Sequence, residues 1–92
     1  MTNNSKITVY TKDNCIYCEK AKALLKGLSY SFTEQKYGKD FKTPEDLYEA
    51  VGKKVRTMPQ IVVDDKLLGG YNQLVEYFVE QGKVNFKGEI NK

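Results

Sequence analysis

The stretch YTKDNCIYCEKAKALL, residues 10–25, decides the fold because it joins the end of an apolar run to the start of a helical pattern. Its two cysteines, Cys15 and Cys18, are the only ones in the chain. From Cys15 onward, apolar residues recur every three or four positions, as on one face of a helix. Gly27 marks the end of that pattern. We therefore expect a strand, a short loop and a helix, with both cysteines where the helix begins.

The segments on either side of this stretch continue an α/β pattern. KITVYT, residues 6–11, is short and β-branched and predicts a buried strand. YSFTEQ, residues 30–35, alternates aromatic with polar residues and predicts a second strand. Because a helix connects the two strands, they should pair in parallel as a right-handed unit.

A second helix is predicted for TPEDLYEAV, residues 43–51. Thr43 is the expected N-cap, Pro44 suits the first helical position, and Asp46 falls three residues after the cap. Gly52 follows directly and should end the helix. This is a complete set of start and stop signals for a short helix.

A hairpin and a last helix follow. QIVV, residues 60–63, and KLLG, residues 66–69, flank a two-residue connection that suits a tight hairpin. YNQLVEYFVEQG, residues 71–82, has one apolar face and predicts a helix, for which Asn72 is the expected cap. The predicted order is strand, helix, strand, helix, strand, strand, helix.

Length and composition limit the class of protein. A chain of 92 residues fits one domain, so we expect residues 1–92 to form it, with a polar tail at 83–92 that the pattern leaves unassigned. The net charge of +3 comes from interspersed charges of both signs, which argues against nucleic-acid binding. No segment approaches the about 18 apolar residues of a membrane span, and the first residues lack a secretory signal. We expect a cytoplasmic protein with no membrane partner, in a compartment where thiols stay reduced.

The spacing of the cysteines suits redox chemistry. Three residues apart on a helix, two Cα atoms lie about 5 to 5.5 Å from each other, within the range of a disulfide. If Cys15 caps the helix, the amides of Tyr17 and Cys18 and the helix dipole favour its thiolate, which is the nucleophile. Lys12 would add a positive charge one turn upstream. Cys18 belongs to the buried face and should resolve a mixed disulfide that forms on Cys15.

Two other interpretations of the pair stay open at this point. Half a zinc site would need further ligands, because zinc usually takes four, and the sequence has no His and no third Cys. Two unrelated buried thiols could share this spacing by accident. The strand before the pair and the helix after it favour a redox motif instead.

RTMPQ, residues 56–60, places Pro59 directly before a strand, where proline normally interrupts pairing. A cis Met58-Pro59 bond would turn the chain and present the Met58 backbone to an extended peptide. Cis bonds to proline are the minority form, so the residues alone favour trans.

GGYNQ, residues 69–73, has two interpretations. The glycines are typical of a simple tight turn. They can also form a nest of backbone amides that binds a carboxylate at a helix start. Together with Lys12 and Arg56, such a nest would complete a groove for a small anionic peptide beside Cys15.

Four motifs in this order resemble the glutaredoxins: YTKDNCIYC, KAKALL, RTMPQIVVDD and LLGGYNQL. The resemblance covers residues 6–81, and within the family the chain most resembles the small glutaredoxins encoded by bacteriophages. It implies an α/β thioredoxin fold, in which a four-stranded mixed β-sheet is sandwiched by three α-helices and Pro59 is cis.

The resemblance also implies a function, that of a glutathione-dependent thiol–disulfide oxidoreductase. Cys15 would attack, Cys18 would resolve, and reduced glutathione would supply electrons. Disulfide-containing proteins such as ribonucleotide reductase would be substrates of a monomeric enzyme. The residues expected to contact glutathione are Lys12, Tyr17, Arg56, Thr57, Met58, Pro59, Gly70, Tyr71 and Asn72.

Two positions depart from the family's common pattern. Ile16 stands where proline is common, and family members without that proline can hold a glutathione-ligated [2Fe-2S] cluster between two subunits. A cluster carrier is therefore an alternative function. Asn72 stands where Asp is common, which replaces a charged partner of the glutathione ammonium by a neutral amide. A thioredoxin-like reductant is the nearest rival, and the absence of Trp and the Gly-Gly turn argue against it.

Overall fold

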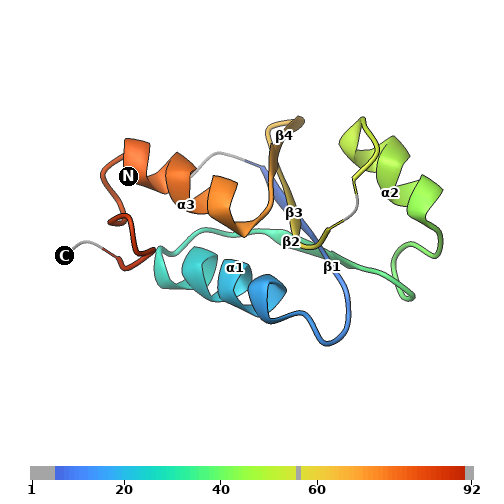
Figure 1. The fold of residues 1–92 in the computed structure, drawn as a ribbon, viewed down its shortest axis with the longest axis horizontal. Coiled ribbons are helices and arrows are strands. Elements are labelled where there is room, and N and C mark those ends of the chain that lie inside the picture. The colour runs from blue at the N-terminus through green and yellow to red at the C-terminus, as the bar shows by residue number, and fades with distance from the viewer. Residues whose placement is uncertain (1–5, 56, 91–92) are drawn as a thin grey trace.

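The computed structural model describes residues 6–55 and 57–90. Its helices and strands follow the predicted order (Figure 1). They are β1 (Ile7–Thr11), α1 (Ile16–Gly27), β2 (Thr33–Lys36), α2 (Pro44–Val51), β3 (Gln60–Val63), β4 (Lys66–Gly69) and α3 (Tyr71–Glu80).

The four strands form one mixed sheet in the order β2-β1-β3-β4. β1 pairs in parallel with β2, with Thr8 opposite Thr33, as the helical connection predicts. The other two pairings, β1 with β3 and β3 with β4, are antiparallel. Asp64 and Asp65 both have positive φ, which allows the two-residue turn between β3 and β4 without a glycine.

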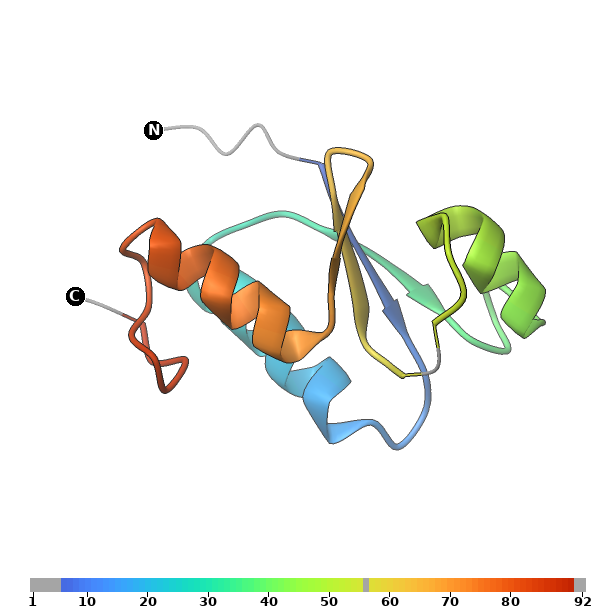
Figure 2. The same ribbon diagram turned by 45° about the horizontal axis from the view of Figure 1, so that its top comes forward.

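The helices cover both faces of the sheet. α1 and α3 lie side by side on one face, and α2 lies on the other (Figures 1 and 2). Alternation along the strands divides the side chains accordingly. Val9 and Ile61 are fully buried in the main core under α1 and α3, while Tyr10 and Val62 pack against a smaller cluster that includes α2. This is the predicted thioredoxin fold.

The second strand begins later than its alternating pattern predicts. Tyr30 and Phe32 do not join the sheet, because both pack against the main core. The Tyr30 ring lies 5.1 Å from that of Phe78 on α3, and the Tyr30 amide donates to the Leu25 carbonyl. Burial of these aromatic rings therefore takes precedence over strand pairing until Thr33.

Two helix caps differ in how well the sequence predicts them. Thr43 caps α2 as expected, since its hydroxyl accepts a hydrogen bond of 3.1 Å from the Asp46 amide. The predicted Asn72 cap of α3 is wrong. Gly70 is the N-cap, and Asn72 lies inside the first turn. The helix starts earlier because Gln73 reaches back and its side-chain carbonyl accepts from the Gly70 amide at 2.9 Å.

The polar end of the chain folds back on the domain. Val84 is 2% exposed and forms an isolated antiparallel bridge with Ile90. The part of the tail up to Ile90, which the pattern leaves unassigned, is therefore packed and not extended.

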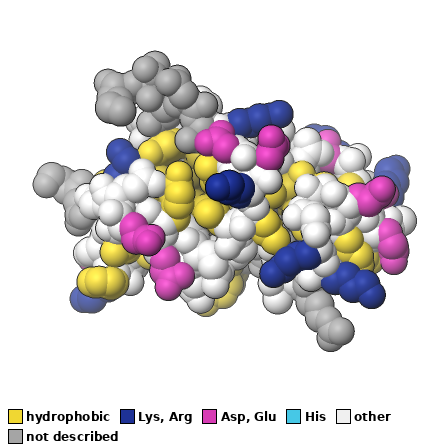
Figure 3. Space-filling view, turned by 90° about the horizontal axis from the view of Figure 1, so that it is seen from above, with side chains coloured by type: hydrophobic (Ala, Val, Ile, Leu, Met, Phe, Trp, Pro, Cys, Tyr) yellow, Lys and Arg dark blue, Asp and Glu magenta, His cyan; other side chains and the backbone are white. Residues whose placement is uncertain are grey.

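The surface carries charges of both signs, interspersed with apolar patches, on the face shown in Figure 3. Among the helices of the described segments, none is long and apolar enough to cross a membrane.

Candidate functional site

The two cysteines lie at the start of α1 and are joined as a disulfide, with Cα atoms 5.2 Å apart. Cys15 is the N-cap, and its Sγ accepts a hydrogen bond of 3.1 Å from the Cys18 amide. Cys18 is fully buried, whereas Cys15 is partly exposed. Spacing, capping and accessibility all agree with the predicted division between an attacking and a resolving cysteine.

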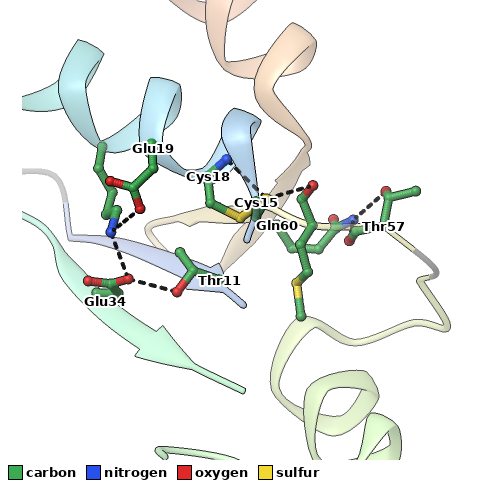
Figure 4. The surroundings of a disulfide bond; sticks show 9 residues. Thr11, Cys15, Cys18, Glu19, Glu34, Thr57 and Gln60 are labelled. Atoms are coloured by element: carbon green, nitrogen blue, oxygen red, sulfur yellow. Dashed lines mark hydrogen bonds and ion pairs between the residues drawn. A yellow bond between two sulfur atoms is a disulfide. The ribbon is translucent and has the colours of Figure 1, made fainter. Parts of the chain in front are cut away.

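A loop before β3 faces the disulfide (Figure 4). The Met58-Pro59 bond is cis, so the trans form favoured by the residues alone is wrong and the form implied by the resemblance is confirmed. The Met58 carbonyl oxygen lies 3.6 Å from Cys15 Sγ. Because the loop turns here, its backbone is presented beside the more exposed sulfur.

Gln60, the first residue of β3, stabilises this loop by hydrogen bonds. It is 4% exposed, and its side-chain amide donates to the Thr57 carbonyl at 2.8 Å and to the Thr57 hydroxyl at 3.3 Å (Figure 4). These bonds satisfy a buried polar side chain and hold Thr57 in one position relative to β3.

A pocket of about 260 Å³ opens between the loop and the start of α3. The rings of Tyr17 and Tyr71 stand 5.8 Å apart at its wall. Its lining residues are Tyr17, Thr57, Met58, Pro59, Gly70, Tyr71, Asn72 and Gln73. The pocket thus joins the N-termini of α1 and α3 through the cis-proline loop.

The start of α3 offers backbone donors to this pocket. Gly70 has no side chain to cap the helix, and the first amides of a helix have no intrahelical acceptor. These amides also lie at the positive end of the helix dipole. The Gly70 amide itself donates to the Gln73 side chain, so the predicted nest has fewer amides free for a ligand than its sequence indicates.

Seven of the nine residues expected to contact glutathione line this one pocket. Lys12 does not line it, and lies instead on a neighbouring pocket of about 350 Å³ that shares Thr57 and Met58. Arg56 lies outside the described residues. The sequence therefore brings most of its predicted set together, across three separate segments of the chain.

Two residues that support the pocket, Gln60 and Gln73, are not predicted by the sequence patterns. The pattern around Gln60 indicates only the first residue of an apolar strand. Gln73 had a usable signal, because Gln three residues after a cap is half of a capping box. Both side chains support backbone that lines the pocket, rather than presenting new groups to it.

An ionic cluster ties α1 to β2 beside the disulfide (Figure 4). Glu34 Oε2 accepts from the buried Thr11 hydroxyl at 2.7 Å and lies 3.0 Å from Lys22 Nζ, which also pairs with Glu19 at 2.9 Å. The Thr11 hydrogen bond, aided by Lys22, holds the pKa of Glu34 below its usual value. The hydrogen bond to Glu19, and the pairing with Glu34, raise the pKa of Lys22.

Comparison with known proteins identifies relatives of this chain. The glutaredoxin family model matches residues 7–68. Glutaredoxin 3 of Escherichia coli is 34% identical over 70 residues, which are 76% of this chain and 82% of that protein.

Solved structures show the same likeness. The structure of reduced Escherichia coli glutaredoxin matches with a TM-score of 0.71 and 31% identity, over 82% of this chain and 94% of that one. Buckwheat glutaredoxin, solved as a complex with glutathione, matches with a TM-score of 0.68, over 86% of this chain and 73% of that one. Its identity of 20% supports the fold alone.

Proposed function

The chain belongs to the glutaredoxin family and is a thiol–disulfide oxidoreductase, and we propose that glutathione is its electron donor. The observation that carries this proposal is the pocket beside Cys15, which offers the backbone of Met58 and open amides at the start of α3. Glutathione is a short, extended, anionic peptide with a thiol, so its chemistry suits each of these features.

The disulfide form is the oxidised half of the cycle. A glutathione thiolate attacks Cys15 Sγ, the more exposed sulfur, and the electron pair of the broken S–S bond leaves on Cys18 as a thiolate. A second glutathione thiolate attacks the glutathione sulfur of the mixed disulfide. The products are oxidised glutathione and the Cys15 thiolate, which the Cys18 amide and the α1 dipole stabilise.

The reduced form then acts on substrates. The Cys15 thiolate attacks a glutathionylated substrate at the glutathione sulfur and releases the substrate thiolate. A glutathione thiolate then resolves the mixed disulfide on Cys15. This route requires Cys15 but not Cys18. A protein disulfide instead leaves the substrate bound to Cys15, and Cys18 attacks Cys15 Sγ to release it. Both cysteines are needed for that second route.

Bound glutathione is expected to lie across the pocket. Its cysteinyl backbone would pair with Met58, and its γ-glutamyl carboxylate would accept from the first amides of α3 beside Tyr71. Tyr17 would cover the peptide from the α1 side. Asn72 would face the glutathione ammonium with a neutral amide, which makes a weaker contact than a carboxylate.

We also propose a cytoplasmic monomer that serves disulfide-containing proteins, with ribonucleotide reductase among them. Support for the compartment comes from the donor, since a glutathione pool that reduces Cys15 also keeps the surrounding thiols reduced. Support for the substrate comes from the resemblance, because glutaredoxins commonly serve that enzyme.

Transport of a [2Fe-2S] cluster is the second function to test, because Ile16 replaces the common proline and is 72% exposed beside Cys15. Within residues 6–55 and 57–90, no group of three or more His, Cys, Asp or Glu can hold a metal ion. Cys15 is partly exposed and Cys18 is fully buried, so Cys15 would be one ligand, and glutathione and a second subunit would have to supply the others. Absorbance after anaerobic reconstitution with iron, sulfide and glutathione tests this function, and a colourless protein would exclude it.

The first experiment compares glutathione-coupled reduction of a small mixed disulfide by the wild type, Cys15→Ser and Cys18→Ser. We expect Cys15→Ser to lose roughly a thousandfold or more in turnover, because the nucleophile is gone. Cys18→Ser should keep most turnover on this substrate and lose reduction of protein disulfides. A wild type without glutathione-dependent turnover would overturn the proposal.

A further inference from the structure

A second and larger groove lies between α3 and the turn of the C-terminal tail. Its volume is about 790 Å³. We call it the α3–tail groove and define it by Tyr71, Val75, Glu76, Val79, Glu80 and Phe86. Asn72 and Lys87 also border it, so Tyr71 and Asn72 belong both to this groove and to the glutathione pocket.

The tail side of the groove is a firmly held turn. The Asn85 side-chain carbonyl accepts from the amides of Lys87 and Glu89 at 2.9 and 3.0 Å, and the Gly88 amide donates to the Asn85 carbonyl at 2.9 Å. Gly88 has φ of 82° and packs so closely on α3 that an added Cβ would lie 2.9 Å from Tyr71 Oη. The turn is thus anchored to a residue of the glutathione pocket.

This turn presents Phe86 to solvent. Its side chain is 91% exposed, which is unusual for a phenylalanine and leaves its apolar surface in water. Because the surrounding turn is hydrogen-bonded, little ordering would be needed for the ring to take part in binding. Val75 and Val79 supply apolar surface on the facing helix.

The acidic side of the groove works against the stability of α3. Glu76 and Glu80 are exposed and four residues apart on the helix, where like charges repel each other. Glu80 stands in the last turn, where the helix dipole disfavours negative charge, and that turn carries no basic residue. No ion pair joins either carboxylate to another residue of the described segments. A basic partner would relieve all of this unfavourable electrostatics.

The net charge of the residues that border the groove is opposite in sign to that of the whole chain. Two carboxylates and the single cation Lys87 border it, whereas the whole chain has a net charge of +3. This local reversal favours a positively charged partner over a second copy of the chain.

We propose that the α3–tail groove binds the segment flanking the reactive cysteine of a protein disulfide substrate, and that this segment carries apolar and basic side chains. The substrate chain would occupy the glutathione pocket at its cysteine and continue past Tyr71 and Asn72 into the groove. Phe86 and Val79 would take an apolar side chain, and Glu76 and Glu80 would pair with basic ones. This inference rests on the proposed function and names its substrate class.

The test uses two synthetic peptides, each with one Cys-x-x-Cys disulfide flanked on both sides by Leu and Lys in one peptide and by Leu and Glu in the other. The enzymes are the wild type, Glu76→Lys/Glu80→Lys and Phe86→Ala. Glu45→Lys/Glu49→Lys is the matched control, because it reverses two exposed charges at the same spacing on α2. Thermal unfolding verifies folding, and Glu76→Lys/Glu80→Lys should be at least as stable as the wild type, because the second substitution places a positive charge in the last turn of α3.

For the wild type we expect kcat/KM to be higher with the basic peptide. Glu76→Lys/Glu80→Lys should lower kcat/KM for the basic peptide roughly tenfold and reverse the preference. Phe86→Ala should lower kcat/KM for both peptides, and the α2 variant should change neither. Turnover of a small glutathione mixed disulfide should stay the same in all of them.

Three results would overturn the inference. One is equal kcat/KM for both peptides with the wild type. Another is an unchanged preference in Glu76→Lys/Glu80→Lys. The third is a self-associated wild type in sedimentation that these substitutions dissociate, which would assign the groove to a second copy. A wild type that does not turn over the small glutathione mixed disulfide would instead contradict the proposed function.

Discussion

The N-termini of α1 and α3 flank the same cis-proline loop, but only α1 has an N-cap side chain that accepts a hydrogen bond from the first turn. α1 is capped by a side chain, since Cys15 Sγ accepts from the Cys18 amide. The N-cap of α3 is Gly70, which has no side chain to accept from the first amides. α2 serves as the reference, because an ordinary hydroxyl cap, that of Thr43, marks its start.

This difference shows how one physical feature can serve two tasks. The positive end of α1 acts on a sulfur within the chain and favours its thiolate. The positive end of α3 stays open to a ligand, because a glycine cap leaves the first amides without a side-chain acceptor. If the open end of α3 binds glutathione, a substitution there should change KM for glutathione, and a matched substitution at the cap of α2 should not.

Gly70→Asp should have the largest effect. A carboxylate at the cap would accept from the first α3 amides and repel the glutathione carboxylate, so KM for glutathione should rise roughly tenfold or more. The extended backbone at Gly70 tolerates a side chain, since an added Cβ would have its nearest neighbours at 3.5 Å. Steady-state kinetics with varied glutathione measures the change.

Thr43→Asp on α2 is the control for Gly70→Asp and should leave KM unchanged. Both substitutions should keep the melting temperature at or above that of the wild type, because Asp is a favourable cap. An unchanged KM in Gly70→Asp would show that the start of α3 does not bind the donor.

Gln60→Leu tests the loop between the two helix ends. The substitution removes both hydrogen bonds to Thr57 and replaces the buried polar side chain by an apolar one. We expect the free energy of unfolding to fall by about 1 to 2 kcal/mol, and kcat/KM for glutathione to fall several-fold as the Met58 backbone loses its position.

Urea unfolding and steady-state kinetics measure these two effects. Gln81→Leu, at the exposed C-cap of α3, is the matched control and should change neither quantity. A Gln60→Leu enzyme with wild-type kinetics would show that the loop needs no brace.

Asn72→Asp should strengthen the open end of α3. A carboxylate in the first turn would pair with the glutathione ammonium and would also suit the helix dipole, so KM should fall about two- to fivefold. Varied glutathione at two salt concentrations measures it, because the gain should shrink at high salt. A higher KM would place the ammonium elsewhere.

The smallest effect concerns how α1 is held to the sheet. Lys22 on α1 pairs with Glu34 on β2, whereas α3 packs through its apolar face. The pKa of Glu34 is lowered in the folded protein, so its stabilisation is present above its unfolded value of 4.5 and is lost as the pH falls through the folded pKa. The loss should stay below about 1 kcal/mol, because the pair is solvent-screened.

Urea unfolding at pH 6 and at pH 3 tests this dependence. The difference in stability between the two conditions should be smaller for Glu34→Gln than for the wild type. Glu49→Gln, on the exposed side of α2, should behave as the wild type does. If the stability of Glu34→Gln depends on pH as strongly as that of the wild type, the ion pair does not contribute to this dependence.

The sequence alone determined the order of the elements and the chemistry of Cys15 and Cys18. Periodicity, capping by Thr43 and the three-residue spacing of the thiols are local properties, so a pattern can reveal them. The resemblance then supplied most of the pocket residues by position.

The tertiary structure decided what depends on contacts between distant segments. The Met58-Pro59 bond is cis, whereas the residues alone favour trans, and the Met58 carbonyl lies beside Cys15, which is 43 residues earlier in the chain. Packing of Tyr30 against the main core delays the second strand, and the hydrogen bond from the Gly70 amide to Gln73 makes Gly70, not Asn72, the N-cap of α3. The tail turn that exposes Phe86 is held by packing on Tyr71, which no local pattern encodes. Local signals name the helix ends, but only packing decides which of them remains open for a ligand.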